Sequence, residues 1–175
     1  MDARCQCGAV SFKTPLPQPL RLYICHCEEC KRQTGSAFGT SAIFPKFKLP
    51  KADLMGVYAR PTASGATLYC YFCRNCGTRL IHATPDKNVV SVKGGCIDGL
   101  DWKTAVHIWT KNAMVPIPEG AENHREEAEY TDYGDQQEAL DQPTDLRGSG
   151  GTPVGASPSF DGRCELSGSL NAIVH

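Results

Sequence analysis

The sequence predicts an all-β, mainly β-sheet domain over residues 1–118. Up to about Pro118 the chain is a series of short apolar segments, rich in β-branched and aromatic residues and bounded by Gly, Pro, Asn or Asp. No stretch in this part has long helical periodicity. Three clusters of cysteines lie between the segments, as is typical of a small domain that a metal ion staples together.

Eight segments are predicted to be strands because each one alternates or is β-branched over four to seven residues. Residues 28–33 are predicted to form one or two helical turns that end at Gly35, which would place Cys27 and Cys30 about one turn apart. In chain order, the predicted strands are 9–13, 20–25, 41–44, 56–59, 66–72, 79–82, 89–92 and 105–109.

Two cysteine pairs run directly into a glycine. Gly8 follows Cys7 and Gly77 follows Cys76, and bending backbone amides towards sulfur often requires the positive φ that glycine adopts cheaply. Asn75 lies inside the turn between Cys73 and Cys76, where we expect it to take the left-handed conformation.

The length and the cysteine count indicate one domain in a reducing compartment. A chain of 175 residues suits one ordinary domain. Its ten cysteines would suit a disulfide framework in a secreted protein, but residues 1–4 lead into the first pair without the apolar stretch of a signal peptide. No run approaches a membrane span. We therefore expect a cytoplasmic protein with no membrane partner, whose clustered thiols bind metal.

Charge divides the chain into two parts. Residues 1–118 carry 15 Lys+Arg against 7 Asp+Glu, and residues 119–175 carry 3 against 12. The first part has no block of basic residues, so nucleic acid is not an expected partner. A mildly cationic surface would favour small anionic substrates, although an ordinary solvated surface explains the charge equally well. The sequence leaves the oligomeric state open.

Residues 119–175 are predicted to be an appendage, largely disordered or draped over the domain. The first half is acidic and the second is rich in Gly, Ser and Pro, and both compositions resist forming a core. The acidic stretch could lie loosely against the basic domain, near the groove where an anionic substrate would enter. The alternative is a solvated extension without a role.

Seven cysteines have the spacing of metal ligands. Zinc is the first-row metal that proteins most often hold by sulfur alone, so we expect two Zn²⁺ ions. Two pairs give a closed, structural four-sulfur site. The remaining cluster gives a three-sulfur site with a vacant position that can hold water or substrate, which predicts an enzyme. The structural ligands are Cys5, Cys7, Cys73 and Cys76, and the catalytic ligands are Cys25, Cys27 and Cys30.

An alternative remains for the three-sulfur site, because Cys70 or another donor could close it. Cys70 and Cys96 otherwise suit burial as small apolar residues, and Cys164 lies in the appendage. His26 lies between two ligands and is expected to support the site or pack, whereas His82 and His107 alternate within apolar strands. Three cations could meet a substrate carboxylate near this site or stay solvated: Lys31, Arg32 and Lys93.

The motifs together resemble those of the glutathione-dependent formaldehyde-activating enzyme family, also called the centromere protein V type. The resemblance covers residues 3–118 and rests on the order and spacing of all seven ligands. The matching segments are Cys5-Gln6-Cys7-Gly8, Cys25-His26-Cys27-Glu28-Glu29-Cys30 and Phe72-Cys73-Arg74-Asn75-Cys76-Gly77, with later similarity at 92–98 and 107–109.

The resemblance implies an Mss4-like fold, one structural and one catalytic zinc on the ligands given above, and a carbon–sulfur lyase activity. In that activity, glutathione adds to formaldehyde to give S-hydroxymethylglutathione. Two features depart from the family pattern, namely Cys96, where a hydroxyl residue is expected, and the acidic appendage. The competing hypothesis is a non-catalytic zinc module whose groove recognises a protein or a small molecule.

Overall fold

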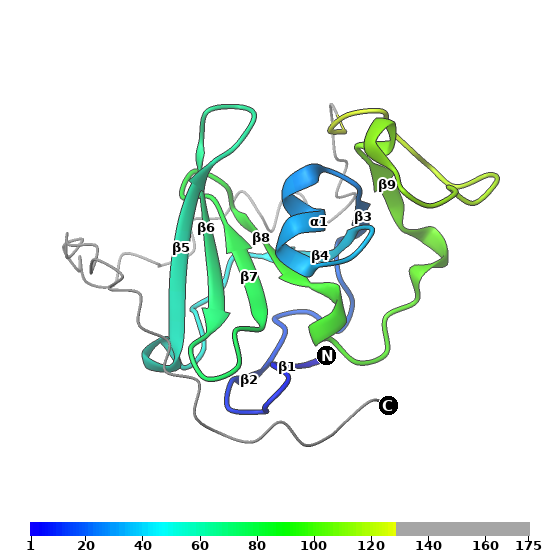
Figure 1. The fold of residues 1–175 in the computed structure, drawn as a ribbon. Coiled ribbons are helices and arrows are strands. Elements are labelled where there is room, and N and C mark those ends of the chain that lie inside the picture. Colours follow the sequence, from blue (N-terminus) through cyan, green and yellow to red (C-terminus); the bar gives the residue numbers. More distant parts are fainter. Residues whose placement is uncertain (129–175) are drawn as a thin grey trace, which may run out of the picture.

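The structure is a computed structural model, and it describes residues 1–128 of the chain. The part of the appendage from residue 129 onwards, including Cys164, lies outside the described residues. Within them the chain forms a small two-stranded sheet and a seven-stranded sheet with one short α-helix, so the predicted mainly β fold is confirmed (Figure 1). No helix in this part of the chain is long and apolar enough to cross a membrane.

The seven-stranded sheet has the order β5-β6-β7-β8-β4-β3-β9. Neighbouring strands are antiparallel, except that β3 and β9 pair in parallel at one edge. The strands of both sheets are β1 (Asp2–Arg4), β2 (Ser11–Lys13), β3 (Arg21–Cys25), β4 (Gly39–Pro45), β5 (Met55–Pro61), β6 (Thr67–Cys73), β7 (Arg79–Ala83), β8 (Val89–Lys93) and β9 (Val106–Ile108).

The helix α1 (Glu28–Thr34) is the one that the sequence predicts, and Gly35 ends it in the left-handed conformation with φ 58°. Cys27 is its N-cap, because the Cys27 sulfur accepts a hydrogen bond from the Cys30 amide. In Figure 1, α1 lies over β3 and β4. Four short 3₁₀ segments complete the described secondary structure: Ala52–Leu54, Gly94–Cys96, Trp102–Thr104 and Thr110–Asn112.

The large sheet has one apolar face and one polar face. On β4 and β8 the buried core side chains alternate with polar ones, as the period-two geometry of a strand requires. The apolar face packs Ala42, Phe44, Val90, Val92 and Ile81, each at most 4% exposed. The polar face carries Ser41, Ser91, Lys93 and His82, and this is the face that the three-cysteine cluster joins.

The two predicted glycine turns are present. Gly8 has φ 76° and Gly77 has φ 73°, so both take the conformation in which a side chain would be strained. The expectation for Asn75 is wrong, because among the described residues only Lys51 and Trp109 combine a side chain with positive φ. Gly77 alone supplies the left-handed position of this turn, and Asn75 instead interacts through its side chain with the Cys7 sulfur.

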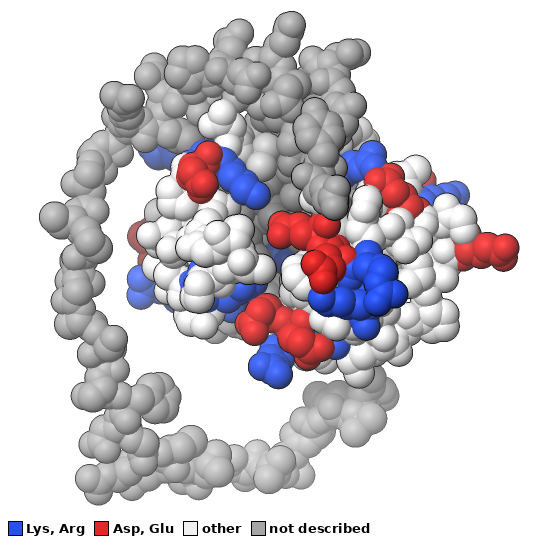
Figure 2. Space-filling model, turned by 90° about the horizontal axis from the view of Figure 1, so that it is seen from above, with Lys and Arg blue, Asp and Glu red and all other residues white. Residues whose placement is uncertain are grey.

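The start of the appendage is ordered along β9. The amides of His107 and Trp109 donate to the carbonyls of Glu122 and Glu126, both at 2.9 Å, and the His124 amide donates back to His107 at 2.8 Å. Residues 122–126 therefore run along the β9 edge of the sheet, with one isolated bridge between Asn123 and His107, beyond the predicted domain limit at 118. On the face in Figure 2, acidic and basic side chains lie next to one another, without a block of one sign.

Candidate metal centres

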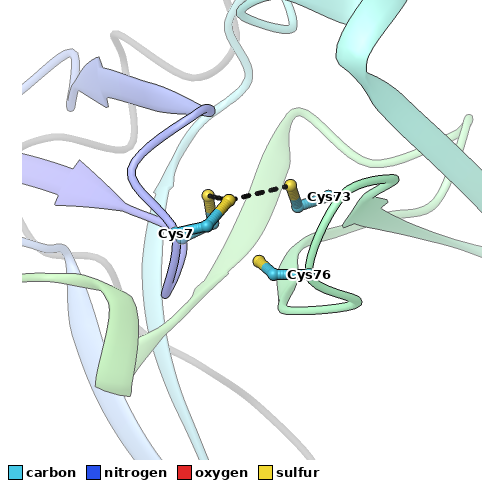
Figure 3. A group of neighbouring side chains, drawn as sticks. Cys7, Cys73 and Cys76 are labelled. Carbon is cyan, nitrogen blue, oxygen red and sulfur yellow. Dashed lines mark hydrogen bonds between the residues drawn. The ribbon is translucent and has the colours of Figure 1, made fainter. Parts of the chain in front are cut away.

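The first centre joins two hairpin turns that are far apart in the sequence. Cys5 and Cys7 lie where β1 leads into its turn, and Cys73 and Cys76 lie at the corresponding turn between β6 and β7. The four sulfurs all lie within 4.8 Å of one another. Figure 3 shows the sulfurs of Cys7, Cys73 and Cys76 facing a common centre, with 3.9 Å between the sulfurs of Cys7 and Cys73.

Hydrogen bonds at this centre favour the thiolates of Cys7 and Cys76, whereas the pKa of Cys73 is raised to about 11. The Val10 amide donates to the Cys5 sulfur at 3.3 Å. The Thr78 hydroxyl lies 3.1 Å from the Cys76 sulfur, and hydrogen bonds from Thr78 lower the pKa of Cys76 to about 5. The Ala9 amide and the Asn75 side chain lower the pKa of Cys7. Four converging sulfurs with hydrogen bonds from amides and a hydroxyl match the donor set of a closed, soft-metal site.

The second centre is built at the junction of β3 and α1. Cys25 ends β3, Cys27 caps the helix and Cys30 lies in its first turn, and the three sulfurs lie within 4.8 Å of one another. Gly39 on β4 is the partner of Cys25, and a Cβ there would lie 3.1 Å from the Cβ of Cys30. Cys30 can approach the sheet because its neighbour on β4 has no side chain.

The protonation states of the three sulfurs depend on one another. Hydrogen bonds from the thiols of Cys25 and Cys30 strongly lower the pKa of Cys27, and the reverse interaction raises the pKa of Cys25. One thiolate with two thiol donors is the arrangement expected of three crowded sulfurs without a cation. A divalent soft metal would replace those protons, so this cluster also fits zinc.

No fourth ligand atom joins this cluster among residues 1–128. Cys70 is fully buried on β6, but its sulfur does not belong to the group of three converging sulfurs. The ring nitrogens of His82 on β7 do not belong to that group either. The described structure thus gives no support to the alternative in which Cys70 closes the site. All nine cysteines in the described part of the chain are free thiols.

Two buried histidines contact one another, and one of them, His26, lies between the ligands Cys25 and Cys27 in the sequence. The Nε2 of His26 lies 3.0 Å from the Nδ1 of His107, and the two rings stack with 5.3 Å between their centroids. Burial lowers the pKa of both histidines, so both rings are neutral. One of the two facing nitrogens carries a proton and donates it in the hydrogen bond to the other. The Nδ1 of His26 is buried without a hydrogen-bond partner. The sequence could not reveal this pair, because only the parallel pairing of β3 and β9 brings the two residues together.

The cations that the sequence places near the cluster differ in their surroundings. Lys31 forms an ion pair with Glu28 at 2.7 Å and also donates to the carbonyl of Asn112 at 3.1 Å. Arg32 is exposed. Lys93 is buried on the polar face of the sheet. Cys96 is buried as well, and burial raises the pKa of its thiol to about 11, which makes it unreactive at neutral pH.

Comparison with known proteins finds a matching family and proteins to which this chain is similar. A family model described as glutathione-dependent formaldehyde-activating enzyme matches residues 1–112. An uncharacterized lyase from Schizosaccharomyces pombe is 30% identical over 101 residues, which cover 57% of this chain and 70% of that protein. A crystal structure of a Rhodobacter sphaeroides protein is 21% identical, with a TM-score of 0.45, and covers 58% of this chain and 91% of that one.

Proposed function

The chain belongs to the glutathione-dependent formaldehyde-activating enzyme family, and from this premise we propose that it is a zinc-dependent carbon–sulfur lyase. Its proposed reaction adds a thiol of the glutathione class to a small aldehyde such as formaldehyde, or runs a related addition or elimination on another carbonyl compound. The family and the likeness to a lyase support a lyase-type function related to glutathione. The identity of the substrates and the dependence on zinc are our proposal.

The observation that carries the proposal is the difference between the two centres. One centre brings four sulfurs together and the other brings three, with no further ligand atom among the described residues. Closed four-sulfur sites are structural, whereas a site with three protein ligands leaves a position for a reactant. We therefore assign the structural role to Cys5, Cys7, Cys73 and Cys76 and the catalytic role to Cys25, Cys27 and Cys30.

Zinc bound by Cys25, Cys27 and Cys30 would lower the pKa of a thiol at its vacant position, so that the sulfur is a nucleophile at neutral pH. The chain itself supplies a fixed geometry. The Cys27 sulfur is held by the Cys30 amide at 3.4 Å, and Gly39 leaves the space that Cys30 occupies. Between Cys25 and Cys27, the buried His26 is held in place by its stacking on the buried His107.

The proposed reaction is redox-neutral. The thiol sulfur forms a bond to the carbonyl carbon, the π electron pair of the C=O bond moves to oxygen, and the proton given up by the thiol ends on that oxygen. With glutathione and formaldehyde the product is S-hydroxymethylglutathione, and no atom is lost. A reaction that depends on reduced thiols suits a cytoplasmic, reducing location, which we propose for this protein.

The test is the rate of exchange between formaldehyde and glutathione, measured by NMR with and without the zinc-loaded protein. The full-length protein should accelerate exchange, and Cys27→Ser should abolish the acceleration while leaving a folded protein with one metal ion. Cys70→Ala is the matched control, because Cys70 is buried outside both sulfur groups, and it should retain the activity.

Equal rates for the wild type and Cys27→Ser would reject formaldehyde and glutathione as the substrates. A screen of other aldehydes and thiols would then separate a different carbonyl substrate from the competing hypothesis of a non-catalytic binding module. Loss of activity in Cys70→Ala together with loss of metal would contradict the assignment of three ligands.

A further inference from the structure

Lys93 is buried beside the three-cysteine cluster without a carboxylate partner. Its residue is 6% exposed, and its ammonium donates a hydrogen bond to the Ser41 hydroxyl at 3.1 Å. Ser41 lies on β4, between β8 and the strand that ends at Cys25, so this bond directs the ammonium towards the cysteine cluster. Lysine is rarely buried unless something compensates its charge.

Further cations lie on the same face of the sheet as Lys93. Strand pairing places Tyr58, Cys70, His82 and Ser91 in one row across β5, β6, β7 and β8. The Arg79 guanidinium lies 5.7 Å above the ring of Tyr58, and its Nη1 lies 3.5 Å from the Nε2 of His82.

Arg60 follows Tyr58 by two residues, so it belongs to the same face of the sheet. Arg60 and Arg79 are partly exposed, whereas Lys93 and His82 are buried.

The pKa of His82 responds to burial and to the cations near it. Burial lowers the pKa of His82 to about 2, and the charges of Lys93, Arg79 and Arg60 contribute to the shift. His82 is therefore neutral, and since arginine can only donate, its Nε2 accepts and its Nδ1 carries the proton.

The positive charge exceeds what the neighbouring groups can neutralise. Among residues 1–128, no Asp or Glu forms an ion pair with Lys93, Arg79 or Arg60. Three thiolates around a divalent ion carry one net negative charge, against three cations here. An excess of two positive charges remains, and a bound anion would offset it.

We propose that Lys93, Arg79 and Arg60 form a binding site for a carboxylate, and that this carboxylate belongs to the thiol whose sulfur is held at the three-cysteine centre. The inference rests on the proposed function for the position of the sulfur. Ser41, which holds the ammonium, lies two residues from Gly39 on β4, and Gly39 is the partner of Cys25 on the neighbouring strand β3. With the usual spacings of a sheet, the Cα atoms of Cys25 and Ser41 are roughly 8 Å apart, and we take this as the span between the sulfur and the carboxylate. The site would thus select long thiols that end in a carboxylate.

The test uses protein with cobalt at the three-cysteine centre, because zinc has no absorption that reports thiol binding. The probes are 6-mercaptohexanoate, whose two ends match the span, and its neutral amide. Wild type should bind the carboxylate about tenfold more tightly than the amide, and Lys93→Met and Arg79→Gln should each reduce this preference to about twofold or less. Lys87→Met, which removes an exposed lysine from the β7–β8 turn, should keep the full preference.

Equal affinity of the wild type for the two probes would overturn the carboxylate site and leave the proposed function intact. If neither thiol changes the cobalt spectrum, the proposed function fails at its vacant position. In that case, titration with inorganic phosphate, followed by NMR of the His82 ring, tests whether the anion site exists. A shift of the His82 ring that is lost in Lys93→Met supports the site, and the absence of any shift in the wild type rejects it.

Discussion

Gly39 shapes the three-cysteine centre by having no side chain. A Cβ at this position would lie 3.1 Å from the Cβ and 3.4 Å from the sulfur of Cys30. Contacts this short require the neighbour to move by a few tenths of an ångström. Because Cys30 is fixed by the first turn of α1, the displacement would pass to its sulfur and change the distances among the three ligands.

Gly39→Ala should therefore weaken metal binding at the three-cysteine centre by about tenfold, as disturbance of groups that orient ligands commonly does. The four-cysteine centre should keep its affinity. Metal content after competition with a graded series of chelators measures both. Gly95→Ala is the control, because a Cβ there meets nothing within 4 Å. Unchanged affinity in Gly39→Ala would mean that α1 can shift as a unit without cost.

At the scale of the elements, residues 119–128 act as part of the sheet. Four backbone hydrogen bonds link this segment to His107, Trp109 and Thr110, at 2.8–3.1 Å. Ion pairs from Arg21 to Glu122 and from Lys111 to Glu126 lie alongside. His107 is 7% exposed, so its amide would lose its partner in a poorly solvated place if the segment were removed.

Truncation after Pro118 should lower the free energy of unfolding by roughly 1–3 kcal/mol, since each lost hydrogen bond contributes about 1 kcal/mol and the entropy of ordering the segment is recovered. Truncation after Ala128 keeps the segment, so the difference between the two truncations measures its contribution. Urea unfolding of the two truncated proteins and the full chain, all loaded with metal, makes the comparison. Equal stability of both truncations would place the domain limit at 118, as the sequence predicts.

Most elements could be predicted because they are local. Alternation, turn residues and the glycine after the helix identify eight strands and α1 within a few residues of their ends. The strand β1 (Asp2–Arg4) escapes prediction, because three residues show too little alternation and the strand depends on its pairing with β2. The ordered structure of residues 119–128 also could not be predicted, because the segment has the acidic composition of a solvated tail and its hydrogen-bond partners lie on or next to β9.

For the whole molecule, the four-cysteine centre connects the small sheet to the large one. It joins the turn after β1 to the turn after β6, alongside other contacts of the β1–β2 hairpin, namely the Ala3–Ile97 bridge and the packing of Phe12 against Phe47. Metal bound there would close a long loop and add its binding free energy to folding.

Cys73→Ser should therefore make the domain unfold or become insoluble at 25 °C, whereas Cys27→Ser should stay soluble with one metal ion in place of two. Circular dichroism and zinc analysis of the purified proteins report both results. Cys96→Ser supplies the comparison for the loss of a buried thiol that binds no metal. A soluble Cys73→Ser protein with two zinc ions would contradict the division into a structural and a catalytic centre.

The candidate site was predictable where its residues are close in sequence. The spacing from Cys25 to Cys30 suffices to group three sulfurs, and two separated pairs suggest one further centre. By contrast, the pairing of His26 with His107 and the gathering of Arg79 and Arg60 around His82 depend on strand order. Strand order is set by the packing of the entire sheet, and no short segment encodes it.

The two centres also differ in when they can form during synthesis. All three sulfurs of the second centre lie within residues 25–30, so they leave the ribosome together. The first centre cannot close until Cys76 has emerged, which at usual translation rates is roughly 2–9 s later. During that interval the nascent chain exposes Cys5 and Cys7 as an incomplete pair beside a complete three-sulfur cluster. Metal available during that interval would meet the three-sulfur cluster before the four-sulfur one, so the proposed staple would be the later of the two centres to load.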